Sequence, residues 1–271
     1  MTAFTTQPES GVHSSRTSTE DETLVALKES LTRSYSKQST SYDARRSMSV
    51  NARFFFDVAY RTIDEMIGTT HERTVHVDVP VGTARFFCYL RDQRRSHRMF
   101  GFDLSPGMLR AGREKVGERS EKLGLTRSDA FHLPLADDSV DILTSMRFFH
   151  LMPRRYWPSL LGEMRRVLRP GGFLIAEMRN PFRGGAVACA VECRDQWFRG
   201  AKPHAYVWPH QVAKLFSDWE RIETRGAGLD GLAQLSTILP KAALRLHGLT
   251  RYAPLRYLTR ELVVKAHKPA G

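Results

Sequence analysis

At 271 residues with 41% hydrophobic content, the chain can bury one good core, and two full domains are not expected. No run reaches the roughly eighteen apolar residues of a membrane span, and the first residues lack the basic start and apolar stretch of a secretory signal, so we expect a cytoplasmic protein. The net charge of +12 favours anionic partners, such as nucleic acid, an acidic lipid surface or an acidic substrate, but a basic proteome or simple solubility explains it equally well.

The N-terminal segment differs in composition from the rest of the chain. It is rich in Ser, Thr, Glu and Gln and poor in large apolar groups, which predicts a flexible tail over residues 1–40. A short helix over Asp21–Leu31 is compatible with this segment, because Leu24, Leu27 and Leu31 recur at helical spacing. From Ser49 onward the apolar residues recur as in an amphipathic helix that packs on a sheet.

Strand and helix patterns then alternate along residues 41–271, which we interpret as one domain. The predicted strands are Thr74–Asp78, Arg98–Asp103, Leu125–Ser128, Val140–Met146, Phe173–Glu177, Arg221–Thr224 and Glu261–Ala266. The predicted helices are Ala84–Asp92, Pro106–Arg119, Arg154–Leu168 and His210–Phe216. This rhythm predicts an α/β fold with a doubly wound, mostly parallel seven-stranded sheet that helices cover on both faces.

Three acidic residues stand at the ends of consecutive predicted strands: Asp78, Asp103 and Asp129. Successive strand ends in an open parallel sheet line one crevice, so these carboxylates can meet around one ligand. Gly82, in the turn after the first strand, has no Cβ and lets a ligand approach the backbone, but the turn lacks the G-x-G-x-x-G pattern of a pyrophosphate cradle. A nucleoside with a ribose diol, an exocyclic amine and a cationic tail matches the set, which points to S-adenosylmethionine.

Each carboxylate has its own expected role. Asp103 is placed to accept both ribose hydroxyls, and Asp129 with the backbone of Ala130 can hold the adenine amine. Asp78 is expected near the methionine end, and Leu104 and Met108 are expected beside the ring. Taken singly, each Asp is also compatible with a helix cap or a solvated loop charge; the ordered set favours the ligand site.

Four segments carry a resemblance to a known family. They are Asp78-Val79-Pro80-Val81-Gly82-Thr83-Ala84-Arg85, Phe102-Asp103-Leu104-Ser105-Pro106-Gly107-Met108-Leu109, the stretch Asp129–Asp141 and the stretch Glu163–Leu174. With these motifs, over about residues 75–180, the chain resembles the class I S-adenosylmethionine-dependent methyltransferases, especially the type 11 group that includes ubiquinone and menaquinone biosynthesis enzymes. The resemblance implies a Rossmann-like fold, methyl transfer, and S-adenosyl-L-methionine contacts at Asp78, Pro80, Gly82, Thr83, Asp103, Leu104, Met108, Asp129, Ala130 and Met146. The sequence departs from the family at Ala84, where the last glycine of the first motif usually stands.

The acceptor side offers fewer signals. Methyl transfer needs a general base only when the acceptor must lose a proton, and His150, just past the fourth strand, is the best candidate for that role. On the sequence alone, a structural His150 that packs or hydrogen-bonds beside Phe149 is favoured over the catalytic role. Arg147 can hold an acidic substrate group, while His132 and Tyr42 are weaker catalytic candidates.

Residues 231–260 form a predicted basic helical insertion before the last strand. The segment contains no Asp or Glu and places Lys241, Arg245, Arg251, Arg256 and Arg260 among leucines and isoleucine. It is typical of an interfacial element or of a lid over an apolar acceptor, and equally of a helical cap that buries its leucines on the sheet. We expect a small, hydrophobic or lipid-like acceptor and peripheral contact with an anionic membrane surface.

Two other functions remain open from the residues. An RNA or protein methyltransferase would use the basic surface, but we see no RNA-binding module, and Arg147-Phe148-Phe149-His150 stands where many amino-directed nucleic-acid enzymes carry Asn/Asp-Pro-Pro-Tyr/Phe. A non-catalytic S-adenosylmethionine-binding partner protein is the second alternative. The three cysteines, Cys88, Cys189 and Cys193, complete no metal ligand set, so we expect no metal and no disulfide framework.

Overall fold

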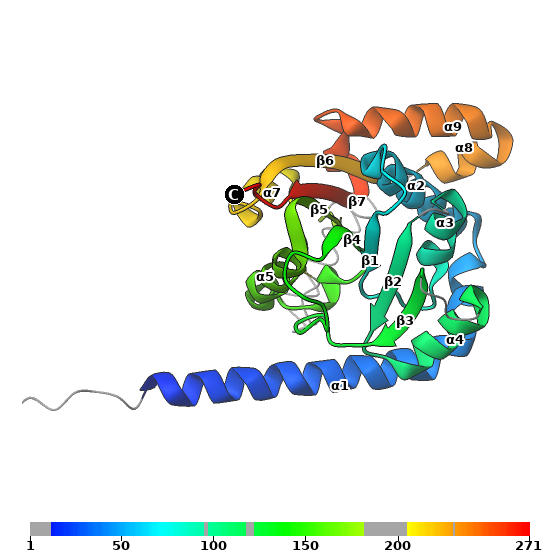
Figure 1. Cartoon of the computed structure of the whole chain (residues 1–271). Helices are drawn as coiled ribbons and strands as arrows, with labels where there is room; N and C mark the ends of the chain where they lie inside the picture. The colour runs from blue at the N-terminus through cyan, green and yellow to red at the C-terminus, as the bar shows by residue number, and fades with distance from the viewer. Residues whose placement is uncertain (1–11, 95–96, 118–121, 182–204, 230) are drawn as a thin grey trace, which may run out of the picture.

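The computed structural model describes residues 12–94, 97–117, 122–181, 205–229 and 231–271, so the predictions for Cys189 and Cys193 lie outside the described residues. Its sheet has seven strands in the order β3-β2-β1-β4-β5-β7-β6 (Figure 1). Strand β7 pairs antiparallel with both β5 and β6, and the other neighbours are parallel. The predicted doubly wound α/β fold with a mostly parallel seven-stranded sheet is confirmed.

The elements follow the predicted order. The strands are β1 Val75–Asp78, β2 Arg98–Asp103, β3 Leu123–Arg127, β4 Val140–Ser145, β5 Leu168–Arg179, β6 Glu220–Leu229 and β7 Thr259–His267. The helices are α1 Val12–Ser47, α2 Val50–Ile67, α3 Arg85–Gln93, α4 Pro106–Val116, α5 Trp157–Val167, α7 Val212–Leu215, α8 Leu232–Ile238 and α9 Pro240–His247. Short 3₁₀ turns are η1 Phe149–Leu151, η2 Arg154–Tyr156, η3 Pro209–Gln211, η4 Gly248–Arg251 and η5 Leu255–Leu258. Helix α4 ends before its predicted limit, because Gly117 follows it with a φ of +82°.

The two faces of the sheet bury separate apolar clusters. On one face, α5 and η1 bring Trp157 and Phe149 against the strands. On the other face, α2, α3 and α4 contribute Ile63, Phe87 and Leu109. All five side chains are essentially inaccessible to solvent, so both layers are fixed by burial of large apolar groups. The strands between them therefore hold their carboxyl ends in a defined arrangement.

Helix α1 differs from the flexible tail predicted for residues 1–40. From Val12 the described chain is helical, and α1 (blue in Figure 1) runs below the sheet toward α4. Leu24, Leu27 and Leu31, the same residues that indicated a short helix, are half-buried against the α5-side core. A chain of low apolar content becomes helical here because one narrow leucine stripe packs on a preformed domain, which composition alone does not reveal.

The insertion forms α8 and α9, which lie above α2 and β6 in Figure 1. Phe54 and Val58 of α2 pack with Leu232, Ala233 and Ala243 in a third, smaller apolar cluster. The predicted helical insertion before the last strand is thus present and is anchored to the domain by its own core. Among the described residues, no helix has the length and apolar character needed to cross a membrane.

Candidate functional site

A cavity opens where the strands β1, β2 and β4 end, and α1 forms its opposite wall. Its empty space, including the mouth, is about 820 Å³. Of the ten predicted cofactor residues, those that line it are Pro80, Gly82, Asp103, Leu104, Met108, Asp129, Ala130 and Met146. The other two, Asp78 and Thr83, do not line it and have different partners. The strand-end crevice expected from topology therefore exists, with most of the predicted side chains in it.

Asp103 is held by the backbone on both sides. Its Oδ2 accepts the Gly82 N–H at 2.9 Å, and its Oδ1 accepts the Ser105 N–H at 2.8 Å. Burial raises the pKa of Asp103 to about 6, and the two backbone hydrogen bonds oppose that rise. Each carboxylate oxygen keeps a further lone pair, so the group can still accept hydroxyls from a ligand in the cavity.

The turn after β1 leaves open space beside Gly82. This residue has a φ of +55°, and a Cβ added to it would meet nothing within 4 Å. Ala84, two residues later, also has a left-handed φ of +59°. A glycine would adopt this conformation freely, whereas the alanine of this chain adopts it with backbone strain. The cavity wall at Gly82 is therefore bare backbone, as a closely approaching ligand requires.

Asp78 lies beneath the cavity instead of in its wall. The side chain is 3% exposed, and its Oδ1 accepts the Thr144 hydroxyl at 2.8 Å. Burial, helped by the negative charge of Asp103, raises the pKa of Asp78 to about 7, against the opposing Thr144 hydrogen bond. Asp78 stands in register with Thr144 of β4, so their side chains lie side by side on one face of the sheet, and its place near the methionine end stays a prediction.

Side chains of α1 reach across to the strand-end side at two further points. Ser36 Oγ and Ser105 Oγ lie 2.8 Å apart, and the Thr83 hydroxyl donates to Asp43 Oδ1 at 2.6 Å. Lys115 of α4 also pairs with Asp43. Thr83 thus holds α1 in place and does not reach the cavity.

Asp129 is shared between its own loop and α1. Its Oδ1 accepts the Phe131 N–H at 3.0 Å, and its Oδ2 pairs with Lys28 Nζ at 2.7 Å. The Lys28 ammonium also lies 4.1 Å from the centre of the Phe131 ring. The predicted adenine-amine acceptor is therefore engaged by a cation that sequence reasoning did not connect with it.

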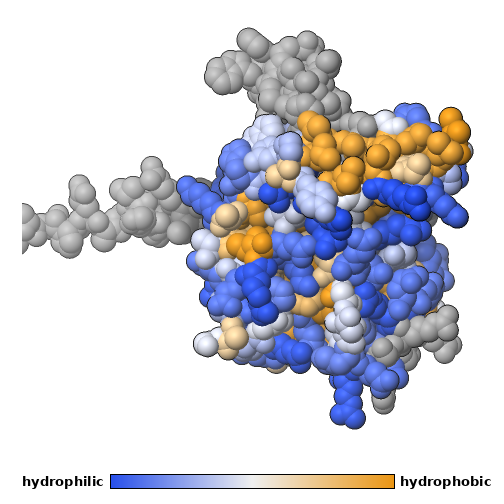
Figure 2. Space-filling model, turned by 90° about the horizontal axis from the view of Figure 1, so that it is seen from above, coloured by the Kyte–Doolittle hydropathy of each residue, from blue (hydrophilic) through white to orange (hydrophobic). Residues whose placement is uncertain are grey.

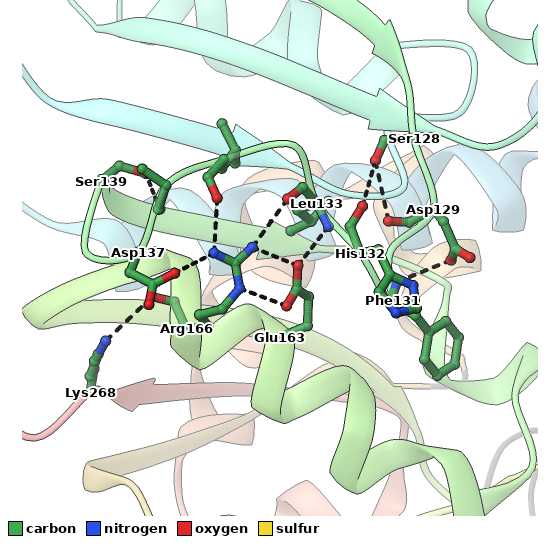
Figure 3. Close-up of polar contacts among 12 residues, drawn as sticks. Ser128, Asp129, Phe131, His132, Leu133, Asp137, Ser139, Glu163, Arg166 and Lys268 are labelled. Carbon is green, nitrogen blue, oxygen red and sulfur yellow. Dashed lines mark hydrogen bonds and ion pairs between the residues drawn. The ribbon is translucent and has the colours of Figure 1, made fainter.

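The loop after β3 is fixed from below by α5, as Figure 3 shows. Glu163 accepts the Leu133 N–H at 2.6 Å, and the guanidinium of Arg166 binds both oxygens of Glu163 at 2.8 Å. Arg166 also donates to the carbonyls of Leu133 and Leu135. Its hydrogen bonds to Glu163, together with the Leu133 N–H, lower the pKa of that carboxyl against the effect of burial. Two of the four sequence motifs thus act as one unit that holds the Asp129 loop.

Arg147 forms a common wall between this cavity and a second one. The second cavity lies between the end of α1, the start of α2 and the strands β6 and β7, where Phe55 and Phe56 line it together with Arg147. The Arg147 guanidinium carbon is 4.3 Å from the centre of the Phe56 ring, and its Nε is 3.9 Å from Glu177 Oε1. Among the described residues, this Nε and both Glu177 oxygens lack a hydrogen-bond partner. Burial disfavours the charge of Arg147, but Glu177 and Glu261 outweigh it, and the pKa of the guanidinium is raised.

The other catalytic candidates are less central. His150 lies in η1, half-buried, and does not line the cavity, whereas Tyr42 of α1 does. His132 contributes its backbone to the loop after β3, where its carbonyl accepts the Ser128 hydroxyl. Sequence reasoning missed Lys28, Tyr35 and Glu177. The leucine spacing around Lys28 and the place of Glu177 at the end of a predicted strand were the signals that pointed to them.

The cavity residues fit a nucleoside with a cationic tail. Asp103 supplies acceptor lone pairs, Leu104 and Met108 supply apolar walls, and Gly82 leaves room at the backbone. In contrast, no group of three or more metal-ligating side chains occurs in the part of the chain that the structure describes. The site thus has the donors and shape expected for S-adenosylmethionine.

Comparison with known proteins identifies the same chemistry. A family model described as a methyltransferase domain matches residues 77–176. Demethylmenaquinone methyltransferase of Listeria monocytogenes serotype 4a is 31% identical over 211 residues, which cover 77% of this chain and 84% of that relative. The enzyme of the same name from Bacteroides fragilis is 35% identical over 113 residues, 40% of this chain, and the match spans less than half of that relative, 44% of its length. A solved S-adenosylmethionine-dependent methyltransferase of Thermotoga maritima shares the fold, with a TM-score of 0.58, 16% identity, and coverage of 84% of this chain and 95% of that one.

Proposed function

Because the chain belongs to the class I S-adenosylmethionine-dependent methyltransferases of the ubiquinone and menaquinone type, we propose that it methylates a small, hydrophobic or lipid-like acceptor. Its cofactor is S-adenosyl-L-methionine. When bound, this cofactor supplies a methyl group on a positively charged sulfur. The relatives are named for demethylmenaquinone, which makes that compound the first acceptor to assay.

The residues of the first cavity would bind and orient the cofactor. Asp103 would accept the ribose hydroxyls, and Leu104 and Met108 would flank the adenine ring. Asp129 and the Ala130 backbone would stand beside the adenine amine, with Lys28 closing that end. Holding the methyl group in line with an acceptor contributes much of the rate enhancement, since effective molarities of well-oriented groups reach about 10⁵ M or more.

The position of Arg147 between the two cavities carries the acceptor assignment. A guanidinium that lines both spaces can touch a molecule in the second cavity at the point nearest the cofactor. Phe55 and Phe56 give that cavity aromatic walls for a ring, and the rest of its lining is largely polar, with Arg46, Asn51 and Glu261, which suits oxygens carried on that ring. The N–H groups of Arg147 that face the cavities would donate to an oxygen on the acceptor and favour its ionised, nucleophilic form, while the buried Nε faces Glu177.

Glu177 would act on the acceptor only through Arg147. Its side chain is buried, lies 3.9 Å from Arg147 Nε and lines neither cavity. The carboxylate keeps the guanidinium charged and limits its orientations. It also makes an acidic acceptor group a poorer fit than the sequence suggested, because such a group would approach a cation that is already balanced by carboxylates.

The test compares Arg147 with Arg85, because both guanidinium groups lie over the ring of Phe56. Arg85 also stands 4.3 Å from the centre of the Phe56 ring but lines neither cavity. With radiolabelled S-adenosylmethionine and demethylmenaquinone, Arg147→Met should lower turnover about 100-fold or more, as expected for loss of one oxyanion donor. The affinity for S-adenosylhomocysteine, measured by calorimetry, should change far less, and Arg85→Met should retain turnover.

Three results would count against the proposal. Full turnover by Arg147→Met would remove the role of Arg147 at the acceptor. Methylation of RNA or protein but of no lipid fraction would favour a different substrate class. Binding of S-adenosylhomocysteine with no transfer to any acceptor would favour a non-catalytic binding protein.

A further inference from the structure

The α8–α9 insertion exposes large apolar side chains that its own core does not bury. Ile238 and Leu239, at the turn between the two helices, are 77% and 55% exposed, and Leu246 and Leu249 are 44% and 43% exposed. Figure 2, which looks down on this side of the molecule, shows a broad hydrophobic area here beside charged residues. We define the insertion face as the exposed residues among 238–252. They lie on the turn between α8 and α9, on α9 and on η4.

The cap interpretation of the insertion accounts for only part of its apolar residues. Leu232 and Ala243 are buried on α2, and Leu235 and Leu244 are half-buried against the same cluster. Ile238 and its neighbours on the insertion face remain in solvent. The insertion is therefore mounted firmly on the domain while it presents a second apolar row outward, a pattern typical of interfacial helices.

Within the insertion the charge has one sign, and the nearby carboxylate of Glu65 on α2 is paired with Arg225. Lys241, Arg245 and Arg251 are exposed on the insertion face, and residues 231–260 contain no Asp or Glu. Apolar side chains flanked by cations complement a surface that is anionic outside and apolar beneath. A second copy of the chain meeting this face through two-fold symmetry would set like charges against each other, so self-association fits less well.

The insertion face also lies close to the second cavity. Helix α8 packs on α2 through Phe54, whose neighbour Phe55 lines that cavity with Arg147. Arg260, the last residue of the insertion and the second of β7, also lines it and lies 4.3 Å from the centre of the Phe55 ring. A lipid-like acceptor leaving a bilayer beside the insertion would meet the second cavity at the Phe55 ring, which also packs against the cluster under the insertion.

We propose that the insertion face docks the protein on an anionic lipid bilayer, with the turn at Ile238 and Leu239 entering the acyl boundary. The proposal rests on the lipid-like acceptor of the proposed function for its purpose, but the docking itself requires no turnover. Binding should weaken as ionic strength rises, because the basic contribution is screened.

The first arm of the test removes the apolar contacts. Vesicles of phosphatidylcholine with phosphatidylglycerol are sedimented with the full chain and with the triple variant Ile238→Ser, Leu239→Ser, Leu246→Ser. The triple variant should bind far more weakly, by about ten-fold for each of the three aliphatic side chains that enters the acyl boundary. Val25→Ser, an equally apolar and 53% exposed position on α1 at the opposite side of the molecule, should bind like the unchanged chain.

The second arm reverses charge. Lys241→Glu with Arg245→Glu should weaken binding to the anionic vesicles by more than twenty-fold, from about five-fold per basic side chain near the surface. The matched reversal Lys37→Glu with Arg110→Glu, both exposed and outside the insertion, should change it little. Pure phosphatidylcholine vesicles should bind the unchanged chain weakly.

Equal binding by the insertion-face variants and their controls would overturn the docking surface, and so would no binding to the anionic vesicles. Concentration-dependent dimerisation that the triple variant abolishes would assign the face to a second copy instead. An assay with a water-soluble, short-chain acceptor separates this proposal from the proposed function. The insertion-face variants should still methylate that acceptor. If the unchanged chain does not methylate it at all, the result counts against the methyl-transfer assignment alone.

Discussion

The two walls of the cofactor cavity are built in different ways. The cofactor floor, formed by Gly82, Asp103, Ser105 and Asp129, is held by backbone N–H groups that bind the carboxylates. The α1 roof, residues 28–43, is held by side chains such as Lys28, which reaches a residue 101 positions away. Strand ends and turns thus make the floor, and single long-range contacts between common side chains make the roof. The floor should govern whether the cofactor binds, and the roof how long it stays.

The largest effect is expected at the floor, from Asp103→Asn. The change replaces a carboxylate that accepts charge-assisted hydrogen bonds, which contribute roughly 1.5–3 kcal/mol each. Affinity for S-adenosylhomocysteine should fall about 100-fold by calorimetry. Asp92→Asn, at an exposed position on α3, is the matched control and should leave the affinity unchanged.

The same residue should make cofactor binding depend on pH. The pKa of Asp103 is raised to about 6, so the ionised acceptor is lost as the pH falls through that value. In the unchanged chain, affinity should be about ten-fold lower at pH 5 than at pH 7. A pH profile that persists in Asp103→Asn would assign the titration to another group and weaken the role given to the floor.

The contrast between floor and roof also marks how far the sequence can be interpreted. Hydrophobic periodicity predicted the alternation of elements, because it depends on a few neighbouring residues. Once the strands were known, the rule that ligands bind at the carboxyl ends of a parallel sheet placed Asp103 and Asp129 in one crevice. The sequence could not predict the contacts of Lys28 or Ser36, because a Lys or Ser on a polar helix has no local feature that indicates its distant partner. For a related reason the sequence could not show that Asp78 stays out of the cavity lining: its partner Thr144 is set by the register of β1 against β4.

An intermediate effect is expected from displacing the roof while leaving the floor intact. A Cβ added at Gly107 of α4 would meet the Ser36 backbone at 2.8 Å, so Gly107→Ala should push α1 away. We expect about a ten-fold faster release of S-adenosylhomocysteine, because part of the cavity wall then opens to water. Amide hydrogen exchange should accelerate within residues 22–47 and stay unchanged in β1, β2 and β4.

Gly162→Ala on α5 provides the matched control for this change. A Cβ there meets nothing within 4 Å, and an exposed helical position gains about 0.5–1 kcal/mol of unfolding free energy from Gly→Ala. Release kinetics should not change. If Gly107→Ala also left release unchanged while exchange in α1 rose, the roof would be a structural addition without a role in cofactor retention.

The smallest effect on cofactor affinity, less than about two-fold, is expected for Asp78→Asn, since Asp78 lies below the floor and bonds to Thr144.

The effect of Asp78→Asn should appear in stability. A carboxyl whose pKa is raised on folding, here from 3.8 to about 7, binds a proton more tightly in the folded state, so the free energy of unfolding falls as the pH rises through that range. The shift corresponds to on the order of 4 kcal/mol, and the unpaired amide of Asn offsets about half of it. The melting temperature of Asp78→Asn should therefore exceed that of the unchanged chain by about 5 °C at pH 8, and the difference should vanish by pH 5. A ten-fold loss of cofactor affinity in this variant would instead return Asp78 to the ligand contacts that the sequence predicted, and the floor would then include the last residue of β1.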